Sequence, residues 1–135
     1  MADVLGHQEL LAVLPPGTPR GRARRIPLAD LAAFPLVTGP KGTSTRRLLD
    51  DALAAADPPL APTVGVVTEH REAIVPLVMA GAGATVLPEP IARNAEALGA
   101  RVAPLAPPIR RPVLLLRRTG ALSPAAEAFR ALAAG

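Results

Sequence analysis

Short apolar segments with strand character alternate along this chain with segments of helical periodicity, and this alternation constrains the fold more than any other feature. The expected strands are residues 4–14, 35–38, 63–69, 84–88, 101–105 and 111–118. The expected helices are residues 27–34, the second part of 39–56, and residues 70–83, 89–99 and 123–135. Such an alternation is typical of an α/β layer fold. Because 135 residues are too few for two ordinary domains, we expect one α/β domain.

Two of the expected helices carry clear boundary residues. In the last helix, Ser123 is in the capping position, Pro124 takes the first helical position, and an apolar stripe follows. The residues of that stripe are Ala125, Ala128, Phe129 and Leu132. In the helix at 70–83, Pro76 is expected to bend or shorten the helix, and Gly81 or Gly83 suits its C-cap.

The composition restricts both the core and the partners. The chain has two Phe and no Tyr, Trp or Cys, so the core must consist of Leu, Val, Ile and Ala, and disulfides and thiolate metal sites are excluded. The net charge is +4, but the only dense basic cluster is "RGRARR" at 20–25, which we interpret as a solvated loop. The lack of aromatic side chains for base stacking disfavours a nucleic-acid surface. No apolar run reaches about 18 residues, so no membrane span is expected, and residues 1–10 show no secretory signal.

The sequence offers little support for catalysis. His7 and His70 lie far apart, and the chain contains neither a Gly-x-Ser-x-Gly elbow nor a His-Glu-x-x-His motif. The stretch "GPKGTST" at 39–45 has two residues between its glycines where a Walker loop has four, and Gly81 and Gly83 precede a strand rather than a helix. We therefore predict no enzyme activity, no catalytic residue, no metal site and no cofactor.

One stretch, "GPKGTSTRRLLDDALAAA" at 39–56, has the composition of an anion-binding helix N-terminus. Free N–H groups and the helix dipole attract anions, and Arg46 can hold a carboxylate with two N–H groups. Further donors are the hydroxyls of Thr43, Ser44 and Thr45. The alternative is ordinary capping, in which Thr43 or Ser44 bonds a backbone N–H and nothing binds. The helix has an apolar stripe of Leu49, Ala52, Leu53 and Ala56, and Arg46 is expected to lie off it.

The order of these segments resembles the C-terminal, effector-binding part of LysR-type transcriptional regulators. The stretch "AIVPLVMAGAGATVLPEPIA" at 73–92 is similar to the family's most distinctive run. The stretches "ELLAVLPPGTP" and "IPLADLAAFPLVTGPKGTSTRRLLDDAL" look like the entry into the family's second subdomain and its first helix. The stretches "RVAPLAPPIRRPVLLLRR" and "LSPAAEAFRALA" look like its return strands and last helix.

The resemblance implies the fold class that we expect: α/β, type 2 periplasmic-binding-protein-like, with one complete subdomain plus the C-terminal remnant of the other. In that family a small-molecule cleft lies between two α/β subdomains joined by two crossing strands. Residues 29–100 would form the second subdomain, and residues 1–28 and 101–135 the crossing strands and the remnant of the first. By this resemblance the chain lacks a helix-turn-helix and the first half of the first subdomain, so we expect a gene fragment, a truncated paralogue or the product of a mis-called start.

The resemblance also implies a site. In the family, the loop before the first helix of the second subdomain faces the cleft, and the next strand end lies beside it because parallel strands end at the same edge. The expected ligand is a small, anionic organic effector. The expected effector-binding residues are Thr38, Gly39, Gly42, Thr43, Ser44, Thr45, Arg46, Thr68, Glu69 and His70.

The implied function is an effector-sensing module of a bacterial transcription regulator in the cytoplasm, which reaches DNA only through a helix-turn-helix absent here and does not bind membranes. We expect homo-oligomers, because a strand that has lost its neighbours, such as residues 113–116, exposes backbone groups and apolar faces. Two alternatives stay open: a fragment of a solute-binding protein, and a non-functional truncated remnant.

Overall fold

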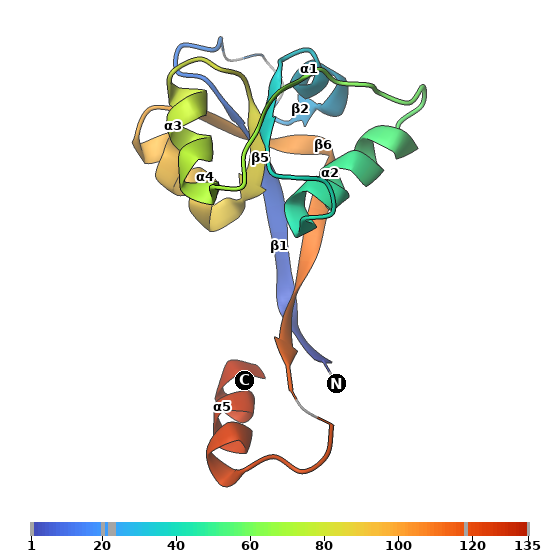
Figure 1. Cartoon of the computed structure of the whole chain (residues 1–135), viewed down its shortest axis with the longest axis vertical. Helices are drawn as coiled ribbons and strands as arrows, with labels where there is room; N and C mark the ends of the chain where they lie inside the picture. Colours follow the sequence, from blue (N-terminus) through green and yellow to red (C-terminus); the bar gives the residue numbers. More distant parts are fainter. Residues whose placement is uncertain (1, 20, 22–23, 118, 135) are drawn as a thin grey trace. The chain divides into compact units, whose positions relative to one another are not determined.

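The structure, a computed structural model, describes residues 2–19, 21, 24–117 and 119–134 (Figure 1). The chain divides into two compact units, a larger one at Glu9–Ile109 and a smaller one that combines Met1–Gln8 with Arg110–Gly135. The basic cluster at 20–25 is described only at residues 21, 24 and 25. Arg118, the end of the expected strand 111–118, lies outside the described residues.

Strands and helices alternate along the chain, which confirms the predicted α/β fold. The strands are β1 (Ala2–Leu14), β2 (Ile26–Pro27), β3 (Leu36–Thr38), β4 (Val64–Val67), β5 (Thr85–Pro88) and β6 (Arg101–Leu116). The helices are α1 (Leu28–Ala32), α2 (Ser44–Ala55), the 3-10 turn η1 (Arg71–Ala73), α3 (Ile74–Met79), α4 (Glu89–Ala97) and α5 (Pro124–Ala134). Within the described ranges, no helix is both long and apolar enough to cross a membrane.

The strands of the larger unit form one continuous layer. Four of them pair in the order β2-β6-β1-β5, and β3 and β4 form a separate parallel pair. A parallel bridge between Leu36 and Ala84 connects β3 to β5. In this bridge, Val37 N–H donates to Ala84 O and Ala84 N–H donates to Pro35 O, each at 2.9 Å. The pair β3-β4 therefore extends the sheet beyond β5.

Strand β1 lies at the centre of the core because both of its faces are covered. Successive side chains of a strand point to opposite faces, and residues 10–14 are all buried. One face packs against α1 and α2, and the other against α3 and α4 (Figure 1). The first face carries Leu10, Ala12 and Leu14, and the second carries Leu11 and Val13. This core is aliphatic at its most deeply buried positions, as the composition predicts.

The prediction of two strands at 101–105 and 111–118 is wrong, because a single strand, β6, runs from Arg101 to Leu116. Four prolines in this segment suggested a break, since proline cannot donate a hydrogen bond within a sheet. Proline is nevertheless compatible with extended backbone, because its φ is fixed near −65°. The parallel pairing of β6 with β2 is short and involves Leu105 and Ala106 of β6. Few N–H groups of β6 are therefore required as hydrogen-bond donors in this pairing.

Pro76 shortens its helix, as the sequence predicts. The expected helix at 70–83 is divided into the 3-10 turn η1 and the six-residue helix α3. Pro76 is the third residue of α3, where its missing N–H would have no partner within the helix. At the other end, Gly81 has φ +89°. Its N–H donates to Val78 O, and Ala82 N–H donates to Leu77 O, which is the Schellman pattern of helix termination.

Gly83 allows β3 and β5 to approach closely. Its φ is +152°, and a Cβ atom at this position would overlap the carbonyl oxygen of Pro35. That carbonyl accepts the hydrogen bond from Ala84 N–H in the bridge between the two strands. A side chain at residue 83 is therefore incompatible with the connection that holds the β3-β4 pair on the sheet.

The smaller unit contains the last helix, α5, with the start that the sequence predicts. Ser123 Oγ accepts a hydrogen bond from Ala126 N–H at 3.2 Å, and Pro124 is the first residue of the helix. None of the described residues of α5 is buried. The predicted apolar stripe is thus present but uncovered in a single chain, with Phe129 62% and Leu132 82% exposed.

We predict that Gly83→Ala lowers the free energy of unfolding by about 3–5 kcal/mol, because it combines backbone strain with a clash against Pro35. Gly81→Ala is the matched control, since Gly81 also has positive φ but has open space around it, and it should cost about 1–2 kcal/mol. Urea unfolding followed by circular dichroism measures both values, because the chain has no Trp or Tyr for fluorescence. Equal losses in the two variants would contradict this account of the β3-β5 contact.

Candidate functional site

The carboxyl ends of β3 and β4 lie side by side in the larger unit. The two strands are parallel, with Thr38 opposite Val67, and Thr68 N–H donates to Thr38 O at 3.0 Å. The loops that follow these strands, at 39–43 and 68–70, therefore leave the sheet at the same edge. The predicted juxtaposition of the two loops is confirmed where they leave the strands, at Thr38 and Thr68.

The loop after β3 is a tight turn that leads into α2. Thr43 N–H and the Thr43 hydroxyl both donate to Pro40 O, at 3.3 and 2.8 Å. Gly42 has φ +89°, a conformation that favours glycine. Thr43 is the N-cap residue of α2, but its side chain makes no capping hydrogen bond because the hydroxyl is turned towards Pro40.

The start of α2 consequently keeps free donors. The first helical hydrogen bond joins Arg47 N–H to Thr43 O at 2.8 Å, and among the described residues no acceptor is bonded to the N–H groups of Ser44, Thr45 or Arg46. Neither Thr43 nor Ser44 therefore caps the helix with its side chain, and this part of the ordinary-capping alternative is wrong. Ser44 is exposed and Thr45 is half-buried. Their hydroxyls and these N–H groups can donate to a ligand at the positive end of the helix dipole.

Arg46 has a different position from the one predicted. The expectation that it lies off the buried stripe of α2 is wrong, because Arg46 is only 7% exposed. Its Nε donates to both oxygens of Asp50, at 3.1 and 3.0 Å, and its Nη1 donates to Gly39 O at 2.9 Å. The side chain thus connects the first residue of the loop to the second turn of α2. The predicted stripe itself is confirmed, with Leu49 and Leu53 each 3% exposed.

The turn after β4 supplies the other predicted residues. Thr68 is half-buried, and its hydroxyl oxygen accepts a hydrogen bond from His70 N–H at 3.1 Å. Glu69 and His70 are exposed, and His70 Nδ1 lies 3.6 Å from a carboxylate oxygen of Glu72. Because both side chains of this pair are about four-fifths exposed, it adds little to stability. Thr38, at the end of β3, is 7% exposed and contributes mainly its carbonyl.

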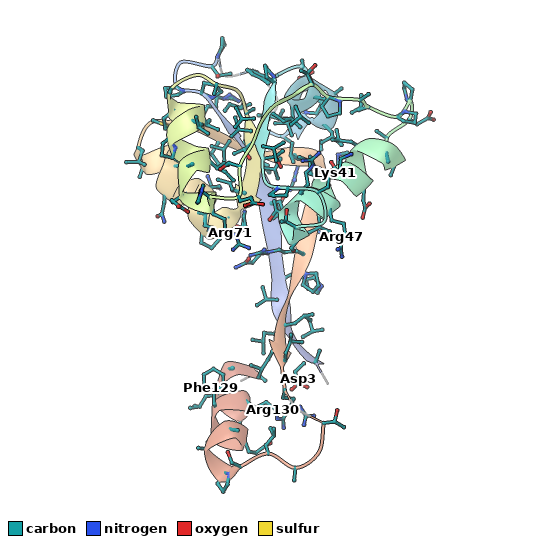
Figure 2. All side chains as sticks on the ribbon, viewed as in Figure 1. Asp3, Lys41, Arg47, Arg71, Phe129 and Arg130 are labelled. Atoms are coloured by element: carbon teal, nitrogen blue, oxygen red, sulfur yellow. The ribbon has the colours of Figure 1, made fainter. Side chains whose placement is uncertain are left out.

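Three cations near this edge were not among the predicted residues. Figure 2 shows Lys41 and Arg47 at the start of α2 and Arg71 at the start of η1. All three are exposed, and Arg47 Nη2 also donates to Gly42 O at 3.2 Å. The sequence contained only one indication that these residues belong near the site, which is that each lies within or next to one of the predicted loops. No group of His, Cys, Asp or Glu in the described part of the chain is arranged to hold a metal ion.

A cavity of about 230 Å³ lies elsewhere in the larger unit, and Leu14, Phe34 and Arg101 are among its lining residues. None of the predicted site residues lines it. The two arginines that line this cavity already donate hydrogen bonds within the chain. Arg25 Nη1 donates to Glu9 at 2.8 Å and to Leu105 O at 2.9 Å, and Arg101 Nη1 donates to Pro19 O at 3.2 Å. The free donors of α2 make the carboxyl edge of β3 and β4 the better candidate site.

Comparison with known proteins gives a consistent result. The effector binding domain of QuiR in complex with shikimate is 25% identical, with a TM-score of 0.78 over 98% of this chain and 63% of that one. The C-terminal domain of a probable LysR family regulator from Rhodococcus sp. RHA1 is 24% identical, with a TM-score of 0.77 over 100% of this chain and 67% of that one. The regulatory domain of Synechocystis PCC6803 CcmR in complex with 2-PG is 16% identical, with a TM-score of 0.75 over 99% of this chain and 65% of that one.

The chain therefore spans about two thirds of the length of each of these structures. No curated protein matches the sequence. The LysR substrate binding domain family matches residues 2–135, which is nearly the whole chain. With the predicted segment order, the α/β fold and this match in agreement, the chain belongs to the LysR substrate binding domain family.

Proposed function

We propose that this chain is the effector-sensing module of a LysR-type transcription regulator and that a small organic anion binds at the carboxyl edge of β3 and β4. The observation that carries the proposal is the start of α2, which has no side-chain cap and follows the loop that leaves the sheet next to the end of β4. Three backbone N–H groups, at Ser44, Thr45 and Arg46, are directed out of the helix there. A bound anion would take the place of the missing cap.

The ligand class follows from the charge at this edge. The helix dipole places a partial positive charge at the N-terminus of α2, and Lys41 and Arg71 add exposed cations nearby. The ligands named for two of the similar structures, shikimate for QuiR and 2-PG for CcmR, are small molecules, and shikimate is a carboxylate. These ligands support a small anion as the effector of this chain.

Further parts of the proposal concern the whole protein. Residues 29–100 would form the second subdomain of the family fold. They lie within the larger unit, Glu9–Ile109, which also contains every residue of the proposed effector site. DNA would be recognised by a helix-turn-helix outside the residues matched here. The module would sense its effector in the cytoplasm without catalysing a reaction, and it would function as a homo-oligomer.

The first test of the proposal replaces one donor. We predict that Ser44→Pro weakens binding of shikimate or of the tightest ligand in a panel of small carboxylates by at least about tenfold, because one charge-assisted hydrogen bond is lost. Pro is favoured at the first position of a helix, and the extended conformation of Thr43 (φ −68°, ψ 152°) suits a residue before proline, so the fold should survive. Isothermal titration calorimetry gives the affinities.

Two controls accompany this measurement. Ser44→Ala removes the hydroxyl but keeps the N–H group, and it should retain most of the affinity. The methyl ester of the carboxylate ligand should bind much more weakly to the unchanged chain, because the ester carries no negative charge. Equal affinity in the Ser44→Pro variant and the unchanged chain would argue against binding at the start of α2.

A second prediction concerns Arg46, which the structure assigns to the support of the loop. Arg46→Ala should lower the free energy of unfolding by about 1.5–3 kcal/mol, because it removes hydrogen bonds to Asp50 and to Gly39 O from a buried position. Arg47→Ala is the matched control and should change stability by less than about 0.5 kcal/mol, since Arg47 is exposed. Thermal and urea unfolding measure both. A stable Arg46→Ala variant with unchanged unfolding would refute this structural role.

A further inference from the structure

Thr38, the last residue of β3, has a buried hydroxyl group without a hydrogen-bond partner. Its carbonyl accepts a hydrogen bond from Thr68 N–H, but its hydroxyl makes no hydrogen bond to any of the described residues. The residue is only 7% exposed, yet the hydroxyl oxygen keeps some contact with solvent, so a ligand can reach it. Because a buried polar group costs free energy when it is left unpaired, this hydroxyl is a candidate donor to a ligand.

The Thr38 hydroxyl lies on the side of the sheet that α2 covers. Successive side chains of a strand point to opposite faces. Leu36 belongs to the cluster beneath α1 and α2, and Val37 belongs to the cluster on the other face, so Thr38 is directed towards α2. Residue 39 brings the strand end close to the helix start, since a Cβ atom on Gly39 would lie 3.2 Å from Thr43 Oγ1. The strand and the helix therefore both supply donors on this side of the edge.

The loop between the strand and the helix keeps its acceptors occupied. Two arginine side chains of α2 donate to Gly39 O and Gly42 O, at 2.9 and 3.2 Å. The N–H group and the hydroxyl of Thr43 both donate to Pro40 O. Carbonyl oxygens that would otherwise repel an anion are thus neutralised within the chain, and a ligand meets mainly donors.

The charge of this segment exceeds that of one carboxylate. Residues 38–47 contain Lys41, Arg46 and Arg47 and no acidic residue. Arg46 is paired with Asp50, which leaves two cations in addition to the positive end of the helix dipole. A phosphate monoester carries about −1.5 to −2 charges at pH 7, so its charge matches this surplus better than that of a carboxylate.

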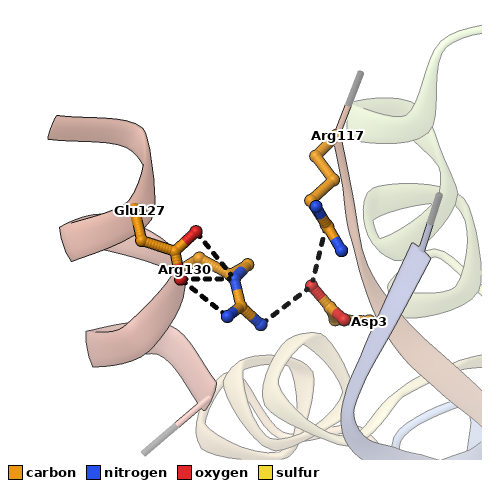
Figure 3. Close-up of polar contacts among 4 residues, drawn as sticks. All are labelled: Asp3, Arg117, Glu127 and Arg130. Atoms are coloured by element: carbon orange, nitrogen blue, oxygen red, sulfur yellow. Dashed lines mark hydrogen bonds and ion pairs between the residues drawn. The ribbon is translucent and has the colours of Figure 1, made fainter. Parts of the chain in front are cut away.

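Another group of arginines, in the smaller unit, is already neutralised (Figure 3). Asp3 Oδ2 lies 3.5 Å from Arg117 Nε and 3.6 Å from Arg130 Nη1. Arg130 Nη2 also donates to Glu127 at 2.7 Å, and this hydrogen bond lowers the pKa of the Glu127 carboxyl. With two carboxylates for two guanidinium groups, this cluster does not compete for an anionic ligand.

We propose that the effector of this chain carries a tetrahedral oxyanion, a phosphoryl or sulfonyl group, and that the Thr38 hydroxyl is one of its donors. The oxygens of such a group point in three directions, so one can accept from Thr38 while the others accept from the N–H groups of residues 44–46. A planar carboxylate has two oxygens and reaches fewer of these donors at once. This ligand class rests on the proposed function, which places an anion at this edge.

Three small anions with the same methyl group test the ligand class. Acetate is planar and singly charged, methanesulfonate is tetrahedral and singly charged, and methylphosphonate is tetrahedral and takes up a second charge near neutral pH. We expect the full chain to bind methylphosphonate at least about tenfold more tightly than acetate, with methanesulfonate in between. The NMR amide shifts of residues 44–46 during titration give the dissociation constants. Equal affinities for the three anions would overturn the inference.

Thr38→Val tests the hydroxyl, because valine keeps the shape of threonine. Its affinity for methylphosphonate should fall about tenfold, whereas its urea unfolding midpoint should stay the same or rise, since an unpaired buried hydroxyl is removed. A merely structural role would not separate binding from stability in this way. Thr38→Ser keeps a hydroxyl and should retain affinity within about threefold.

Thr85→Val is the matched control. Thr85 is 3% exposed, and its hydroxyl likewise has no partner in the described part of the chain. It pairs with Val13 of β1, so its side chain shares the face of the second cluster, away from α2. Methylphosphonate binding should be unchanged in Thr85→Val. Unchanged binding in Thr38→Val, or an equal loss in both variants, would refute the role of Thr38.

Ser44→Pro separates the two levels of the account. If this variant loses acetate binding but the unchanged chain shows no preference for methylphosphonate, the ligand class is wrong and the proposed site stands. If neither anion responds to Ser44→Pro, the proposed site is wrong as well.

Discussion

The burial of both faces of β1 is the constraint on which the rest of the larger unit depends. Residues 10–14 are at most 3% exposed, and their side chains alternate between two aliphatic clusters. A strand in this position needs a helical layer on each face, because apolar side chains on either side must be kept from water. The helices α1 and α2 form one layer, and α3 and α4 form the other. The chain thus acquires a three-layer unit whose fully buried side chains are all aliphatic among the described residues.

The candidate site is a consequence of this layered core. The bridge from β5 to β3 places the β3-β4 pair on the sheet, and both strands of the pair end at the same edge. Leu49 and Leu53 bury one side of α2 in the first cluster, which directs the start of the helix to that edge. Arg46 then holds the connecting loop against the helix through Gly39 O and Asp50. The free N–H groups of α2 are therefore held in place by residues that a ligand need not touch.

Periodicity predicted most strands and the stripe of α2, because these depend on the burial of regularly spaced apolar residues. The juxtaposition of the two loops was implied by the family resemblance, together with the rule that parallel strands end at the same edge. Arg46 was misplaced because its polarity was given more weight than its spacing: residues 46, 49 and 53 follow the same helical face, and a guanidinium can be buried there when acceptors such as Gly39 O are available. The sequence could not predict whether α2 has a side-chain cap. The Thr43 hydroxyl can either accept a hydrogen bond from an N–H group of the helix or donate one to Pro40 O, as it does here. The stripe of α5 was predicted correctly, but its exposure depends on which surface covers it, and a single sequence does not specify that surface.

The central claim is that an anion binds at the exposed start of α2. Amide chemical shifts recorded by NMR during titration with shikimate test it most directly, because each backbone N–H reports its own surroundings. The account predicts the largest shifts at Ser44, Thr45 and Arg46, with smaller ones at Thr68 across the edge. Shifts concentrated around the separate cavity near Leu14 and Arg101, with residues 44–46 unaffected, would contradict it.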